Sequence, residues 1–321
     1  ANTLRTRLRF STAEWQGFSG VVEWDNVTML GDDNYNDTRN KQSNYPIVAD
    51  PEGSGINQAY IKYTGFDKTS ITAGRQRVNL DNQRFIGSVG WRQNEQTMDG
   101  GLVEYKGLDK LTATYGYFSN VYRVFGPHEE PKGSPLAELH SDIQLLNLKY
   151  TLNDMFAVTG YSYLLDLDET QAVSSQTFGL RFTGKIPVVR DYKLGYSAEY
   201  ADQSDYSDNP VEYDADYALA EITVGNPVWE LQAGYELLGS DDGKASVQTP
   251  LATLHKFQGW ADKFLTTPAS GLVDTYVGGT YKFRDYAFTV VAHEYEGDDG
   301  GDDYGTETNL QVAKTFAKNY T

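Results

Sequence analysis

The chain has 321 residues, contains no cysteine and carries a formal net charge of −18. The absence of cysteine excludes disulfides, thiolate metal sites, iron–sulfur clusters and a cysteine nucleophile. The acidic charge argues against nucleic acid as a general partner. No stretch approaches the roughly 18 consecutive apolar residues that a membrane helix needs.

The first segment, residues 3–12, alternates apolar and basic side chains with a period of two. The alternating sets are Leu4, Thr6, Leu8 and Phe10 against Arg5, Arg7, Arg9 and Ser11. This period is typical of a strand with one apolar and one polar face. Further along, Trp229, Leu231, Ala233, Tyr235 and Leu237 alternate in the same way with Glu230, Gln232, Gly234 and Glu236.

Alternation and turn residues together predict about fifteen strands. They are expected near 3–12, 18–29, 57–64, 69–79, 97–107, 111–122, 141–152, 156–165, 175–184, 192–202, 213–224, 228–238, 272–283, 286–296 and 305–317.

The connections between these segments fall into two sets, which alternate along the chain. The short set comprises 13–17, 65–68, 107–110, 153–155, 225–227 and 284–285. The long, polar set comprises 30–56, 80–96, 123–140, 203–212 and 239–271. Outer-membrane barrels have tight periplasmic turns and long extracellular loops. Aromatic residues near the short turns, such as Trp15 and Trp229, are typical of an interfacial girdle.

These patterns predict an all-β fold, a transmembrane antiparallel up-and-down β-barrel that forms a single domain over residues 1–321. Only alternate residues of such strands face lipid, so about ten residues suffice to span the membrane. A short turn follows the first predicted strand, so that strand runs from the long-loop side towards the short-turn side, and one further strand is expected before residue 1. Lys318–Thr321 are expected to begin another strand. We therefore expect a chain that is incomplete at both ends, from a barrel of about 16–18 strands.

Arginines supply the most informative charges. A charge on the lipid face near the midplane costs about 2–4 kcal/mol, so Arg5, Arg7 and Arg9 are expected to point into the lumen. Arg75 and Arg77 fall on one face with Asn79 by alternation. A ladder of guanidinium groups can bind and release anionic solutes. Alternatively, such arginines only brace the wall by pairing with inward acids. The candidate partners are Glu23, Asp25, Glu104, Glu199, Glu221, Glu230 and Glu236.

The most specific local sequence motif runs from Gly74-Arg75-Gln76-Arg77 through Asp81–Asn94. Here the chain resembles the alginate-export porin family of Gram-negative outer membranes. The resemblance implies a monomeric barrel of about eighteen strands, with an arginine-rich lumen that passes anionic uronate polysaccharide.

The 80–96 loop carries Phe85, Ile86, Val89 and Trp91 among polar residues. Either it folds into the barrel and narrows it, with Arg84 and Arg92 facing the solute, or it packs on its neighbours outside. The acidic run 298–303 reads as a solvated surface loop rather than a calcium site. No catalytic, metal or cofactor motif is present, so we expect neither an enzyme nor a bound cofactor.

The sequence thus predicts an outer-membrane channel for passive passage of polar or anionic solutes, including uronate-type saccharides. Its expected surroundings are outer-membrane lipid and lipopolysaccharide, with a monomer favoured and an oligomer left open. The alternative is a structural or partner-binding barrel with a closed lumen that anchors a surface assembly. The expected pore-lining residues are Arg5, Arg7, Arg9, Lys62, Arg75, Arg77, Arg84 and Arg92.

Overall fold

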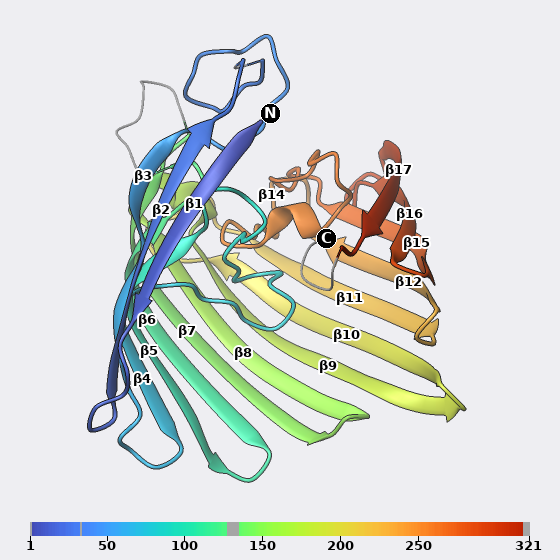
Figure 1. The fold of residues 1–321 in the computed structure, drawn as a ribbon. Coiled ribbons are helices and arrows are strands. Elements are labelled where there is room, and N and C mark those ends of the chain that lie inside the picture. The colour runs from blue at the N-terminus through green and yellow to red at the C-terminus, as the bar shows by residue number, and fades with distance from the viewer. Residues whose placement is uncertain (1, 33, 127–134, 317–321) are drawn as a thin grey trace. The chain divides into compact units, whose positions relative to one another are not determined.

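The computed structural model describes residues 2–32, 34–126 and 135–316 (Figure 1). Residues 127–134 of the long loop expected at 123–140, and the expected strand entry at Lys318–Thr321, lie outside the described residues. No helix in the described ranges is both long and apolar enough to span a membrane.

The described chain is built from one main sheet of fifteen strands in which each strand neighbours the next along the chain. Every pair whose register is described is antiparallel. The strands are β1 (Thr3–Ser11), β2 (Phe18–Met29), β3 (Gly53–Tyr63), β4 (Thr69–Gln76), β5 (Thr97–Leu108), β6 (Leu111–Tyr122), β7 (Glu138–Asn153), β8 (Phe156–Leu167), β9 (Ser175–Val189), β10 (Tyr192–Asp205), β11 (Asp214–Gly225), β12 (Trp229–Leu238), β15 (Leu272–Phe283), β16 (Tyr286–Glu296) and β17 (Asp303–Lys314).

The fifteen strands expected from alternation are confirmed, most of them within a few residues. The largest differences are that β3 begins at Gly53 and that β9 continues to Val189, and β4 stops at Gln76. Connections between the strands also contain small elements that alternation does not reveal. These are the two-residue strands β13 (Ser240–Asp241) and β14 (Ala245–Ser246), and the 3-10 turns η1 (Asp168–Val173) and η2 (Leu254–Lys256).

The residues divide into two compact units, each of which contains part of the main sheet. Unit 1 comprises Ala1–Leu146, Tyr163–Ser174 and Thr249–Thr253, and unit 2 comprises Asn147–Ser162, Ser175–Gln248 and Leu254–Thr321. The single domain over residues 1–321 stays a prediction, and each unit is described by itself.

In unit 1 the alternation of β1 separates two faces. Leu8 and Phe10 expose 62% and 68% of their surface. The intervening arginines lie on the other face, where they contact polar groups of neighbouring segments. We call these the apolar face and the polar face of the sheet.

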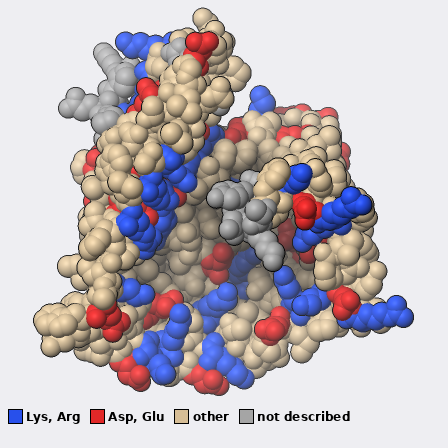
Figure 2. All heavy atoms as spheres, viewed as in Figure 1, with Lys and Arg blue, Asp and Glu red and all other residues tan. Residues whose placement is uncertain are grey.

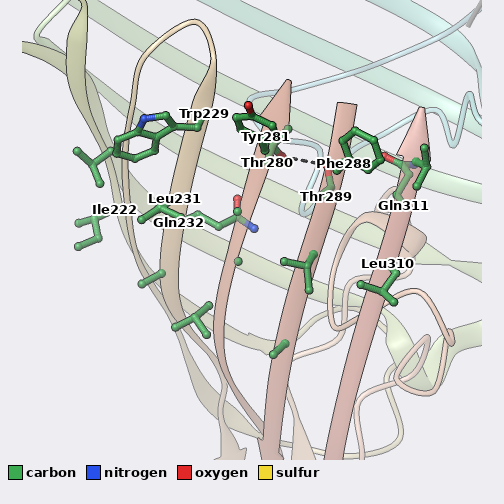
Figure 3. Close-up of a pocket in the computed structure, with 18 residues that line it drawn as sticks. Ile222, Trp229, Leu231, Gln232, Thr280, Tyr281, Phe288, Thr289, Leu310 and Gln311 are labelled. Carbon is green, nitrogen blue, oxygen red and sulfur yellow. Dashed lines mark hydrogen bonds between the residues drawn. The ribbon is translucent and has the colours of Figure 1, made fainter. Parts of the chain in front are cut away.

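Unit 2 shows the same division across β12, β15, β16 and β17 (Figure 3). Apolar side chains such as Leu231 and Leu310 border a shallow hollow of about 1090 Å³. Alternate positions carry polar groups, and the hydroxyls of Thr280 and Thr289 hydrogen-bond each other at 3.0 Å across β15 and β16. Apolar side chains therefore remain solvent-accessible over a wide, continuous area of this face.

Candidate functional site: an arginine–carboxylate cluster on the polar face

The arginines of β1 and the acids of β2 are brought together by strand register. Arg7 lies directly opposite Asp25, and Arg9 lies directly opposite Glu23. Side chains directly opposite each other in an antiparallel pair share a face. Basic side chains gather over this part of unit 1 in the space-filling view (Figure 2).

Arg7 is the most extensively bonded of these arginines. Its Nε and Nη2 donate to the two oxygens of Asp25 at 2.7 and 2.6 Å, and its Nη1 donates to Glu95 Oε1 at 3.0 Å. The planar guanidinium fork suits such bidentate pairing with a carboxylate.

A β-bulge in β3 adds an amide to the cluster. Glu23 pairs with Gln58 while the next residue, Trp24, pairs with Ile56, so Asn57 is the extra residue of the bulge. Its amide donates to Glu23 at 2.9 Å and to Glu95 at 2.8 Å. Bulges re-aim side chains in this way. Asn57 thereby joins two carboxylates of the polar face.

Arg77 completes the cluster from just beyond the end of β4. Its guanidinium donates to Glu23 and to Glu95, the same two carboxylates that Asn57 joins. We define the arginine cluster as Arg5, Arg7, Arg9 and Arg77 with Glu23, Asp25 and Glu95. It holds four positive and three negative charges within unit 1.

Glu95 is buried at the centre of the cluster, although it belongs to a loop. Burial by itself disfavours its charged form, but hydrogen bonds from Arg7, Asn57 and Arg77 outweigh burial and hold the pKa of this carboxyl below its ordinary value. Glu95 is therefore an anion that anchors its loop to the arginines.

Residues 77–96 form a long loop that lies on the polar face of the unit 1 strands. Besides Glu95, the loop offers the carbonyls of Arg92 and Gln93, which accept hydrogen bonds from Arg5 at 2.9 and 3.1 Å. These contacts favour the expectation that the loop folds against the polar face over the alternative that it packs on its neighbours outside.

A second long loop supports the first. Residues Thr249–Thr253 pair with it through Gly87 N to Leu251 O at 2.9 Å and Thr253 N to Gln83 O at 3.0 Å. The Gln96 amide also donates to Leu251 O at 3.0 Å. We call this segment the strap.

Arg75 lies beside the arginine cluster, since it lines a hollow of about 250 Å³ together with Asp25, Asn57 and Glu95. That it shares a face with Arg77 stays a prediction. Arg75 lies opposite Ala59 and Asp99, directly after Gly74, whose φ of 122° interrupts the regular alternation of faces. Arg77 lies beyond the end of the strand at Gln76, so alternation does not assign its side chain to a face.

The charge of Arg75 is neutralised locally by Asp99. Its Nε and Nη2 donate to the two oxygens of Asp99 at 2.9 and 3.0 Å, and its guanidinium carbon lies 3.4 Å from the ring centroid of Tyr122. Such stacking on an aromatic face stabilises a partly desolvated cation.

The other expected residues differ in their environment. Arg84 is only 1% exposed, so the expectation that it faces a solute is wrong in this structure. Arg92 lies 3.9 Å from Asp50 and stacks at 4.2 Å on Trp91. Lys62 lies on β3 opposite Ser19 and Thr72, towards the short turns.

Arg9 differs from the rest of the cluster in its exposure. Its side chain is 45% exposed, about twice the exposure of Arg7 or Arg77. It makes only long contacts, at 3.4 Å to Glu23 and 3.4 Å to the Tyr60 hydroxyl. Of the four arginines, Arg9 is the one best placed to meet a solute.

Unit 2 contains a buried ion pair of its own. Arg181 of β9 lies opposite Glu199 of β10 and donates to it, and the Glu199 carboxylate also accepts from the Tyr161 hydroxyl at 2.8 Å. Nearby, burial and the charge of Arg181 lower the pKa of Lys256, which lies in η2. Among the described residues, no group of three or more metal-ligating side chains is placed to hold an ion.

Sequence reasoning overlooked three contributors to these sites. Glu95 lies in a loop, where alternation assigns no face. Asn57 belongs to a bulge, and the bulge was not apparent from the sequence. Asp99 was assigned to a strand, but only the register reveals its pairing with Arg75.

Comparison with solved structures supports the fold. The chain is similar to OpdK of Pseudomonas aeruginosa, solved with vanillate, at a TM-score of 0.71 and 13% identity over 97% of this chain and 81% of that one. It is also similar to OccD3 (OpdP) of P. aeruginosa, at 0.67 and 16% over 97% and 75%. OccAB4 of Acinetobacter baumannii matches at 0.68 and 14% over 94% and 75%.

The chain therefore has the all-β, antiparallel up-and-down fold of these outer-membrane porin barrels. No protein-family model matches it, and no curated protein matches it significantly.

Proposed function

We propose that the protein is an outer-membrane channel of a Gram-negative cell, through which small polar or anionic solutes pass passively. The observation that carries this proposal is the arginine cluster on the polar face of a porin-type sheet, with Arg9 nearly half exposed at its edge. The apolar face suits contact with lipid and the apolar part of lipopolysaccharide, because alternate residues along its strands are apolar and exposed.

The cluster combines bracing with solute contact. Arg7 and Arg77 are committed to buried carboxylates and hold the 77–96 loop, whereas Arg9 keeps an accessible guanidinium. An accessible arginine binds a carboxylate without losing its charge. Because passage requires release, a single exposed cation serves better than a deep cage.

The solute class we favour is the small carboxylates. OpdK was solved with vanillate, which is a carboxylate. Uronate-type saccharides belong to the same class, and the resemblance of residues 74–94 to alginate-export porins keeps them within the proposal. We propose that the channel acts as a monomer and not as an enzyme.

Liposome swelling with the purified full chain tests this function. Glucuronate, benzoate and glucose are compared at equal osmolarity. We expect swelling with all three, and faster swelling with the two carboxylates than their size alone predicts. No swelling with any solute would favour the alternative, a closed barrel that anchors a surface assembly.

A further inference from the structure

A second polar cavity lies in unit 2, at the ends of the strands next to the short turns. It has a volume of about 870 Å³ and is lined by residues of β7 to β12. This volume lies within the range of about 300–1,000 Å³ that is typical of small-molecule sites. Neither the arginine cluster nor the 77–96 loop contributes to it.

The charged side chains of the cavity are balanced in number. Its lining contains three lysines and three acids, namely Lys149, Lys185, Lys193, Asp154, Glu221 and Glu230. Hydroxyl side chains of Thr183, Ser197 and Thr223 lie among them. Blue and red side chains are interspersed along the edge where the short turns lie (Figure 2).

These opposite charges do not neutralise each other. Within the described part of the chain, none of the three lysines forms an ion pair within 4.0 Å. Glu221 accepts a hydrogen bond from the Tyr276 hydroxyl at 2.6 Å, and its negative charge also acts on Lys256 of η2. The contrast with the arginine cluster is clear, since there Arg7 and Arg77 are each paired with buried carboxylates.

Register explains why the cavity is open. Lys185 lies opposite Gly195, and Gly195 lies opposite Thr223 on its other side. Lys193 lies opposite Gly225. The two glycines place no side chain of their own between the lysines of β9 and β10 and the acids of β11 and β12, and the Thr223 hydroxyl fills the space over Gly195.

A lining with equal numbers of opposite charges gives little net attraction for a simple anion or cation. Charges that are kept apart are complementary to a solute that itself carries both signs, because each end then gains a charge-assisted hydrogen bond. We propose that this cavity binds small zwitterionic solutes, with the carboxylate towards Lys185 and Lys193 and the ammonium towards Glu221 and Glu230. The proposal rests on the proposed function only in that the solute reaches the cavity through the channel.

Isothermal titration calorimetry on the detergent-solubilised full chain tests this site with three matched probes. These are 4-aminobutyrate, butyrate and butylamine, which share a four-carbon chain and differ in their charged ends. We expect 4-aminobutyrate to bind at least tenfold more tightly than either singly charged probe. Equal binding of butyrate would overturn the proposal in favour of a plain anion site.

Variants locate the site. The double substitution Lys185→Gln with Lys193→Gln is expected to weaken 4-aminobutyrate binding at least tenfold, and Glu230→Gln to weaken it severalfold. The matched control, Lys68→Gln with Lys110→Gln, removes two exposed lysines from short turns of unit 1 and is expected to change nothing. All of these side chains are exposed on strand or turn surfaces, so folding should be unaffected. Equal loss in the control would contradict the assignment.

Calorimetry and conductance separate this proposal from the function. If the chain conducts ions but binds the three probes equally, the proposed channel function stands and the zwitterion site is contradicted. If the chain binds 4-aminobutyrate selectively but does not conduct ions, the zwitterion site stands and the proposed channel function is contradicted.

Discussion

Arg77 contacts Glu23 and Glu95, whose side chains are only 2% and 5% exposed. Removing one partner of a buried ion pair leaves a charge without compensation in a poorly solvated place. These carboxylates also accept hydrogen bonds from Arg7, Arg9, Asn57 and Gln58. At the scale of the residue, the arginine cluster is therefore a bracing device as well as a basic surface.

Arg77→Ala should lower the free energy of unfolding by about 3 kcal/mol, the lower end of the range for breaking a buried pair, since Arg77 itself is partly exposed. Urea unfolding of the refolded chain in detergent measures this change. Lys263→Ala, at an exposed loop position, is the control and should stay within about 0.5 kcal/mol. An equal loss in both variants would contradict the bracing role.

Glu95 makes the cluster sensitive to acid. Its folded pKa lies below the ordinary value of 4.5. Its contribution to stability is thus fully present above the unfolded pKa, and it is lost as pH falls through the folded pKa. The urea midpoint of the wild type should therefore fall between pH 5 and pH 3 by more than that of Glu95→Gln. Parallel pH profiles for the two proteins would show that Glu95 has no such role.

At the scale of the element, alternation predicts the strands well because each strand presents one apolar and one polar face. It also predicts that Arg5, Arg7 and Arg9 share a face and that Glu23 and Asp25 are available as partners. It fails where the backbone leaves the regular pleat. Gly74, at a φ of 122°, marks such a place, because a Cβ there would lie 2.3 Å from Ala59 O.

Loop placement could not be predicted for a different reason. The 77–96 loop is held by hydrogen bonds to the strap, which lies more than 150 residues further along the chain. No local pattern encodes a contact of that sequence separation. The aromatic and aliphatic residues of the loop indicated burial, but only the structure shows the face against which they are buried.

Thr253→Val tests the strap. The Thr253 hydroxyl accepts from Val89 N at 3.2 Å and donates to Gln83 Oε1 at 2.7 Å, so its removal leaves both groups unsatisfied. We expect hydrogen exchange of the amides in the 77–96 loop to accelerate about tenfold, which corresponds to about 1.4 kcal/mol. Thr249→Val, in the same strap, is the control. Unchanged exchange in Thr253→Val would show that the strap does not hold the loop.

At the scale of the whole molecule, the fifteen-stranded antiparallel sheet and the porin-type fold agree with the pattern of short and long connections. The apolar residues that a soluble sheet would bury are exposed here, which is expected of a wall that faces lipid. Each unit has its own charge pattern among the described residues: unit 1 has the paired arginine cluster, and the unit 2 cavity has lysines and acids in equal numbers.

The ion selectivity of single channels in planar bilayers tests the central claim most directly. The account predicts a conducting channel whose reversal potential in a KCl gradient shifts towards cation selectivity in Arg9→Gln. Lys110→Gln, which removes one positive charge from a short turn, should leave the reversal potential unchanged. A wild-type chain that inserts without conducting, or a reversal potential that is the same with and without Arg9, would contradict it.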